Sequence, residues 1–207
     1  MYYSVRPHPV FRSVLRKALW RVKTKEKKIY LTFDDGPIPK VTPWVLDVLD
    51  EYKVKATFFC VGENILKHPE IFEQIKMKGH AVANHSHTHL NGWKTENDIY
   101  YKNIESCTKL VGSKLFRPPY GKLKPSQYSL LNTQHSIVMW DVLAGDFDHR
   151  ITKEKCLENV LEHTREGSIV LFHDSLKARE RMEYALPLFL RHFLDKGFSF
   201  EVLNNKL

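Results

Sequence analysis

Three histidines stand close together in the run Asn84-His85-Ser86-His87-Thr88-His89. Imidazole nitrogens are frequent ligands of divalent transition metals, and packing alone rarely explains so dense a cluster. On an extended strand all three side chains share one face, whereas on a helical turn only His85 and His89 do. The run therefore predicts a metal site, although its spacing does not choose between these two ligand sets.

Two adjacent carboxylates, Asp34 and Asp35, follow the apolar run at 29–33 and precede Gly36 and Pro37. Alone, this sequence is also typical of a polar turn. With two imidazoles, one carboxylate completes a three-ligand site that leaves a coordination position for water, as catalytic zinc sites do. A metal lowers the pKa of such a water and polarises a carbonyl, and the second carboxylate can take the water's proton.

Polar side chains also follow three later apolar runs, where an ordinary strand end does not need them. An imidazole across the site from a metal could protonate a leaving amine. Together with the metal site, this set indicates the hydrolysis of an amide. The residues concerned are Arg117 in the run Arg117-Pro118-Pro119-Tyr120-Gly121, Asp141, Asp146 and Asp148 after Trp140, and His173 with Asp174 after Leu171.

Short apolar runs rich in β-branched and aromatic residues alternate with segments of helical period, the pattern of successive strand–helix units. This alternation predicts a parallel barrel or a doubly wound sheet, in which catalytic side chains gather at the carboxyl ends of the strands. The polar residues above stand at those ends. The predicted strands are 29–33, 56–61, 81–83, 115–117, 136–140, 168–172 and 198–203, and the predicted helices are 42–52, 63–78, 95–111, 125–133, 152–165 and 179–196.

The formal net charge of +8 is concentrated in residues 1–28, which hold nine Lys/Arg against one acid. The remainder has 23 bases and 23 acids, so the basic composition says little about the substrate. Apolar residues at helical spacing over 9–23 predict an amphipathic helix, which either closes the body or lies on an anionic membrane. We therefore divide the chain into a basic N-terminal arm, 1–27, and a body, 28–207.

The three cysteines, Cys60, Cys107 and Cys156, are far apart and lack CxxC spacing. This favours free, buried thiols in a reducing compartment. The basic N-terminus has no apolar run long enough for a secretory signal, and no apolar stretch has transmembrane length. We expect a cytoplasmic protein, or one attached peripherally to a membrane.

Taken in order, these motifs resemble those of the polysaccharide deacetylases, the fourth carbohydrate esterase family. Members of this family remove acetyl groups from N-acetylated sugars in chitin-like oligomers or peptidoglycan. The resemblance covers residues 29–203 and makes 28–207 the catalytic domain. It implies an α/β fold, a distorted parallel (β/α) barrel similar to a TIM barrel, which agrees with the seven predicted strands. It also implies one divalent metal, zinc first, with cobalt, nickel or manganese as alternatives.

The resemblance further implies a division of labour among the early motif residues. Asp34 would be the catalytic base and Arg117 would orient it. His87 would be an intervening residue without a ligand role. The metal ligands would be Asp35, His85 and His89.

In the later motifs, His173 would be the general acid. The backbone N–H of Tyr120 would help to stabilise the tetrahedral oxyanion. Leu171 and Trp140 would form the apolar wall that receives the acetyl methyl group.

Three aspartates are candidates for the residue that orients His173. Asp146 stands where the family has an aspartate that holds the acid histidine, by the orienting logic of other catalytic triads. This chain departs from the pattern in the next residue, because Phe147 stands where the family usually has Trp. Asp141 and Asp148 therefore remain alternatives for the role.

The sequence thus predicts a metal-dependent hydrolase of carbon–nitrogen bonds other than peptide bonds. It would release acetate from an N-acetylglucosamine-type sugar in an oligo- or polysaccharide. One alternative keeps the mechanism but changes the substrate, to a lipid-linked sugar that is deacylated or deformylated, or to a non-sugar amide. The absence of a leader and the amphipathic arm favour that alternative. A non-catalytic barrel whose arm binds nucleic acid is not expected, because a scaffold need not keep base, ligands and acid together.

Overall fold

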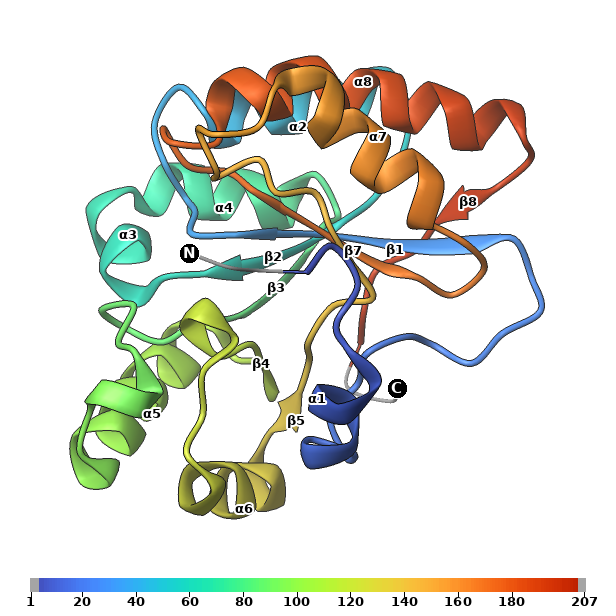
Figure 1. Ribbon diagram of the computed structural model, residues 1–207. Coiled ribbons are helices and arrows are strands. Elements are labelled where there is room, and N and C mark those ends of the chain that lie inside the picture. Colours follow the sequence, from blue (N-terminus) through green and yellow to red (C-terminus); the bar gives the residue numbers. More distant parts are fainter. Residues whose placement is uncertain (1–3, 205–207) are drawn as a thin grey trace.

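The strands of the protein form one curved parallel sheet (Figure 1). The computed structural model describes residues 4–204, so residues 1–3 of the arm and 205–207 of the body lie outside the described part. Seven strands lie in the order β5-β4-β3-β2-β1-β7-β6, and their ladders are parallel. This confirms the predicted distorted parallel barrel of about seven strands. The strands are β1 (Lys28–Asp34), β2 (Thr57–Cys60), β3 (Ala81–Asn84), β4 (Leu115–Phe116), β5 (Ser136–Ile137), β6 (Val142–Leu143), β7 (Ile169–His173) and β8 (Ser199–Phe200).

Helices cover the outside of the sheet, and α7 packs against α8 (Figure 1). Within residues 4–204, no helix has both the length and the apolar character needed to span a membrane. The three cysteines are free and buried, as predicted. The α-helices are α1 (Pro9–Val14), α2 (Thr42–Glu51), α3 (Gly62–Lys67), α4 (Pro69–Met77), α5 (Asn97–Val111), α6 (Pro125–Gln134), α7 (Lys153–His163) and α8 (Arg179–Asp195), and the 3-10 turns are η1 (Gly92–Lys94) and η2 (Pro119–Gly121).

Strand β1 lies in the middle of the sheet, and all but its first residue are buried. Phe33 stacks on Phe58 with ring centroids 5.0 Å apart and lies 6.3 Å from Phe172. An almost continuous apolar run is typical of a parallel strand that is covered on both faces. The register pairs Asp34 of β1 with His173 of β7, so the carboxyl ends of the two strands are level. The fold thereby brings two of the predicted catalytic residues to one edge.

Two of the predicted strands are wrong in extent. The strand predicted over 136–140 ends at Ile137, because Val138 forms its bridge with Leu19 of the N-terminal arm. A separate short strand, β6, follows and pairs with β7. The strand predicted over 198–203 is only β8, which pairs with the start of β1 outside the main strand order.

The helix predicted over 63–78 is also wrong, since it consists of α3 and α4. His68 separates them with φ −137° and ψ 56°, outside the helical region. It precedes Pro69, and a residue before proline is disfavoured in the α conformation. The apolar period continues across this break, and for that reason the sequence pattern does not reveal it.

The amphipathic helix predicted over 9–23 is wrong beyond its first part, because only Pro9–Val14 is helical. The apolar side chains of α1 point outward, with Val10 64% and Val14 61% exposed. Further along the arm, Leu15 and Trp20 are buried. The second half of the apolar pattern therefore packs on the body, but as irregular and extended chain.

The N-terminal arm lies between the two open edges of the sheet. The backbone N–H of Leu143 in β6 donates to Val5 O at 2.9 Å. Next to β5, the N–H of Met139 donates to Leu19 O at 2.8 Å. Arg21 also forms an antiparallel bridge with Ser168, just before β7. The arm therefore satisfies backbone groups that the incomplete barrel would otherwise leave unpaired.

Candidate active site

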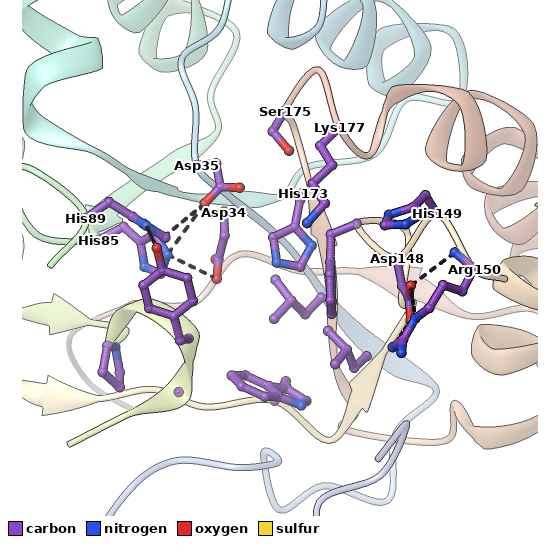
Figure 2. A pocket seen from close by; sticks show the side chains of 17 residues that line it. Asp34, Asp35, His85, His89, Asp148, His149, Arg150, His173, Ser175 and Lys177 are labelled. Atoms are coloured by element: carbon purple, nitrogen blue, oxygen red, sulfur yellow. Dashed lines mark hydrogen bonds and ion pairs between the residues drawn. The ribbon is translucent and has the colours of Figure 1, made fainter. Parts of the chain in front are cut away.

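A carboxylate and two imidazoles converge at the ends of β1 and β3 (Figure 2). One ligand atom from each of Asp35, His85 and His89 can be chosen so that all three lie within 4.8 Å of one another. Asp35 Oδ1 is 3.3 Å from His89 Nε2 and 3.8 Å from His85 Nε2. This is the predicted ligand set.

His87, the third histidine of the run, does not join this group. Its side chain lies against the first residue of α3, since a Cβ built on Gly62 would meet His87 Nδ1 at 2.2 Å. The chain after β3 is neither the extended strand nor the helical turn that the spacing suggested. Ser86 has φ 65° and His89 has φ 56°, and these two left-handed residues turn the other two histidines to one side.

Hydrogen bonds fix the loop that carries these histidines. Asn84 Oδ1 accepts from Ser86 N at 2.7 Å. Asn103 of α5 accepts from the N–H of His87 at 2.8 Å and from that of Thr88 at 3.1 Å. The left-handed residues are thus held from both sides of the loop.

In His85 and in His89, the ring nitrogen that faces away from Asp35 has a hydrogen-bond partner. His85 Nδ1 is 2.9 Å from the carbonyl oxygen of Arg117, so this nitrogen carries the proton and donates. His89 Nδ1 is 3.1 Å from the hydroxyl of Tyr120. Outer partners of this kind fix the tautomer and leave Nε2 free for a metal. The donor set and its orientation therefore fit a divalent cation in an open, three-ligand site.

Burial and nearby charges shift the pKa values of His85 and Asp35 toward the protonation states that bind a cation. Burial lowers the pKa of His85 to about 4, although the charge of Asp34 opposes the shift, so its imidazole is neutral at neutral pH. Burial acts against ionisation of Asp35, but the hydrogen bond with His89 and the nearby His173 and His85 hold its pKa well below the usual range. A carboxylate and a neutral imidazole are the forms that bind metals.

Asp34 is buried beside this group and is held by Arg117. Arg117 Nη1 donates to Asp34 Oδ1 at 2.7 Å and to Thr32 Oγ1 at 2.9 Å, and Nη2 donates to Met139 O at 2.8 Å. Both side chains of the ion pair are almost inaccessible to solvent. The other oxygen of Asp34, Oδ2, lies 3.7 Å from His85 Nε2 and faces the ligand group.

His173 faces Asp34 from the end of β7 (Figure 2). Its Nδ1 lies 2.8 Å from Asp146 Oδ1, and its backbone N–H donates to Asp146 Oδ2 at 2.7 Å. Burial lowers the pKa of His173, but the charge and hydrogen bond of Asp146 outweigh burial and raise it to about 9. The two alternative aspartates have arginine partners in place of His173, since Asp141 accepts from Arg12 and Asp148 accepts from Arg150.

These groups open into one cavity of 620 Å³. Tyr120 lines it from η2 with φ 61°, and a Cβ on the next residue, Gly121, would meet Trp140 Cη2 at 2.7 Å. Arg117 and Asp146 stand behind the cavity, holding residues that line it. The predicted site residues that line the cavity are Asp34, Asp35, His85, His89, Tyr120, Trp140, Leu171 and His173.

Sequence reasoning assigned no role to Asp174, although it directly follows His173. Asp174 is buried, accepts from Gly36 N at 3.0 Å and accepts from Thr42 Oγ1 at 2.6 Å. Burial raises its pKa to about 8, although the hydrogen bond from Thr42 opposes the shift. Its contacts hold the turn that follows Asp35. The only sequence signal was its position beside the histidine.

Comparisons with known proteins agree with this geometry. The family described as polysaccharide deacetylase matches residues 21–135, more than half of the chain. Over 197 residues the chain is 33% identical to a peptidoglycan-N-acetylglucosamine deacetylase of Bacillus cereus, covering 91% of this chain and 92% of that protein. The chain belongs to the polysaccharide deacetylase family.

Two other relatives also match most of the chain. A chitooligosaccharide deacetylase of Azorhizobium caulinodans is 35% identical over 174 residues, covering 78% of this chain and 80% of that protein. A crystal structure of a peptidoglycan N-acetylglucosamine deacetylase superposes with a TM-score of 0.83 at 32% identity, covering 90% of this chain and 91% of that chain. The family fold therefore extends beyond residue 135, into the part that carries Asp146 and His173.

Proposed function

We propose that this chain hydrolyses the N-acetyl group of an N-acetylglucosamine-type sugar in an oligo- or polysaccharide and releases acetate. The observation that carries the proposal is the convergence of a ligand group, an ion-paired aspartate and an aspartate-held histidine on one cavity. The names of its relatives, which are deacetylases of peptidoglycan and of chitooligosaccharides, support the choice of substrate.

In this proposal, Asp35, His85 and His89 hold one divalent metal. Zinc is our first choice, because a carboxylate and two imidazoles with an open position are typical of catalytic zinc. Cobalt, nickel and manganese are alternatives. When bound, such an ion supplies a lowered pKa for water and polarisation of the amide carbonyl.

Asp34 acts as the general base in this scheme. Arg117 donates to Oδ1, while Oδ2 faces the ligand group. Asp34 can therefore take a proton from water as the water oxygen adds to the carbonyl carbon of the acetamide.

His173 acts as the general acid on the other side of the amide. Asp146 fixes Nδ1, so Nε2 is the nitrogen that can deliver a proton to the substrate. The raised pKa keeps the imidazole protonated at neutral pH. As the C–N bond breaks, the sugar nitrogen takes this proton and leaves as an amine, while the acetyl group leaves as acetate.

The rest of the cavity orients the acetyl group. Tyr120 lines the cavity, and its backbone N–H would donate to the developing oxyanion. Leu171 and Trp140 offer an apolar wall for the methyl group. These assignments follow the family motifs residue by residue.

Metal content and acetate release test the proposal together. Purified protein should bind about one divalent ion per chain and release acetate from N-acetylglucosamine oligomers. A chelator should stop the reaction, added zinc should restore it, and Asp34→Asn should lower kcat by at least about 100-fold, as expected for the loss of a general base. Acetate release that survives both chelation and Asp34→Asn would rule the mechanism out.

A further inference from the structure

The cavity extends beyond the proposed reaction centre, to a side formed by the residues after Asp146 and after Asp174. Three carboxylates line the whole cavity, namely Asp34, Asp35 and Asp148. Asp34 forms an ion pair with Arg117, and Asp35 belongs to the ligand group. Asp148 accepts from Arg150 Nε at 2.8 Å and from its Nη2 at 2.7 Å. The negative charges of the lining are thus matched by partners of their own.

Lys177 lines the same cavity without such a match. Its ammonium group lies over the Phe147 ring, with Nζ 5.7 Å from the centroid, and its backbone carbonyl accepts a hydrogen bond from Arg181. No ion pair joins its ammonium group to a carboxylate within residues 4–204. The ring of Phe147 in turn packs edge-on against His173, with centroids 5.1 Å apart. An uncompensated positive charge therefore stands one aromatic ring away from the proposed general acid.

Two neutral donors accompany Lys177 in the lining of the cavity. Ser175 and His149 also line this side of the cavity, and Figure 2 shows Ser175 and Lys177 on the same loop beside His173. An ammonium group with a hydroxyl and an imidazole nearby matches the donors that carboxylates and phosphates accept from. The ammonium group lies over the ring of Phe147, and contact with a ring reduces the freedom that a surface lysine would lose on binding an anion.

We propose that Lys177 and Ser175 bind an anionic group of the substrate, so that the preferred substrate is an acidic N-acetylated amino sugar. The anion is a carboxylate or phosphate on the reacting sugar or its neighbour. This inference rests on the proposed function, because it places the acetamido group at the reaction centre. Attraction between the ammonium and the anion lowers the free energy of the complex, and added salt weakens it.

The test compares substrates that differ in charge. We would measure kcat/KM of metal-loaded protein for a neutral N-acetylglucosamine oligomer and for an oligomer whose alternate sugars carry a lactyl carboxylate. N-acetylglucosamine 1-phosphate and its neutral methyl glycoside form a second pair, which separates phosphate from carboxylate. We expect the wild-type protein to prefer the acidic member of at least one pair. Lys177→Met should lower that preference by roughly threefold to tenfold, and Lys177→Glu should lower it further.

Lys153→Met is the matched control, because Lys153 also lies over an aromatic ring, with Nζ 4.9 Å from the Tyr184 centroid, but does not line the cavity. It should leave the preference unchanged. Equal preference in wild type, Lys177→Met and Lys177→Glu would overturn the inference while acetate release still supports the proposed function. If no substrate releases acetate, the affinity for the same compounds is measured by calorimetry. An affinity for the acidic compounds that is the same in Lys177→Glu and in the wild type would also overturn the inference.

Discussion

Four residues of the site hold a left-handed backbone that side chains other than glycine rarely adopt. They are Asp35 with φ 87°, Ser86 with φ 65°, His89 with φ 56° and Tyr120 with φ 61°. Each such conformation costs about 1–3 kcal/mol and persists only where its surroundings determine it. Two of the four belong to the ligand group and a third contacts it, so the strain is concentrated where side-chain direction matters most.

The first prediction is that Asp146 sets the pH dependence of the reaction. The contact with Asp146 raises the pKa of His173 to about 9 against the effect of burial. Because the acid must be protonated, wild-type kcat/KM should fall as the pH rises through about 9. In Asp146→Asn the pKa should drop, and the fall should begin at least about one pH unit lower, since a lost charge partner changes a pKa by about 1–3 units.

The pH profile of kcat/KM for both proteins checks this, with Asp195→Asn as a control that removes an exposed carboxylate from the end of α8. An alkaline limb that does not move in Asp146→Asn would exclude Asp146 as the partner that sets the profile.

The contact between Asp146 and His173 also affects stability. Because the pKa of His173 is raised, the protonated imidazole stabilises the fold fully below about pH 6.5, and this contribution is lost as the pH rises through about 9.

Tyr120 carries the second prediction. Its hydroxyl is the outer partner of His89 Nδ1, at 3.1 Å. In Tyr120→Phe this partner is lost, and metal affinity should fall about 10-fold or more, the usual effect of removing an outer hydrogen bond from a ligand histidine. Competition with a chromophoric chelator measures the affinity without relying on activity. Tyr101→Phe, which removes the hydroxyl bonded to Ser126 O on the surface, should not change it, and an equal affinity in Tyr120→Phe would contradict the prediction.

Motif spacing predicted that these polar residues gather at strand ends, but it could not choose between neighbours. Asp141, Asp146 and Asp148 are close in sequence, and only the tertiary contact with His173 separates them. Asp174 was missed for a similar reason, since its partners Gly36 and Thr42 are more than one hundred residues away along the chain. Local pattern reports which residue types are present, whereas pairing depends on the folded chain.

At the scale of elements, the N-terminal arm is part of the barrel wall. Arg12 donates to Asp141 Oδ1 at 2.5 Å, and Asp141 also accepts from Ser168 at 2.8 Å. The carboxylate is fully buried, directly after Trp140 of the cavity wall. This ion pair ties the arm to the chain between β5 and β6. The helical spacing of the arm did not predict it, because the extended conformation follows from pairing with the sheet edges and not from local propensity.

The third prediction concerns the ion pair between Arg12 and Asp141. Arg12→Ala removes the nearest cation from a buried carboxylate, and Arg6 at 3.6 Å and Arg165 at 3.9 Å compensate only in part. We expect the free energy of unfolding to fall by about 2 kcal/mol. Arg16→Ala is the matched control, since Arg16 is exposed on the same arm, and its effect should stay within about 0.5 kcal/mol. Urea unfolding of both variants gives the comparison, and equal stabilities would show that the pair does not hold the arm.

Over the whole molecule, charge and apolar exposure are distributed unevenly. Residues 1–28 carry the entire formal net charge of +8, while the remainder is neutral. Arg12 is turned inward to Asp141, whereas Arg16 and Lys17 remain exposed. The apolar side chains of α1 point outward beside them, and such exposed apolar groups among basic ones are typical of surfaces that meet anionic lipid. Together with Arg16 and Lys17, these apolar side chains form the surface on which the alternative of membrane contact can be tested.

The fourth prediction is that this surface binds anionic vesicles. Attraction is worth about 1 kcal/mol for each basic residue near the lipid, so reversing Arg16 and Lys17 to Glu should weaken binding at least about thirtyfold. Cosedimentation in low salt, with vesicles rich in anionic phospholipid and with neutral ones, measures the effect. Lys102→Glu with Lys109→Glu makes the same charge change on the exposed side of α5 and should have little effect. If both double variants bind the vesicles as the wild type does, this surface does not bind lipid and the prediction is wrong. If both bind equally weakly, the attraction depends on net charge and not on this surface.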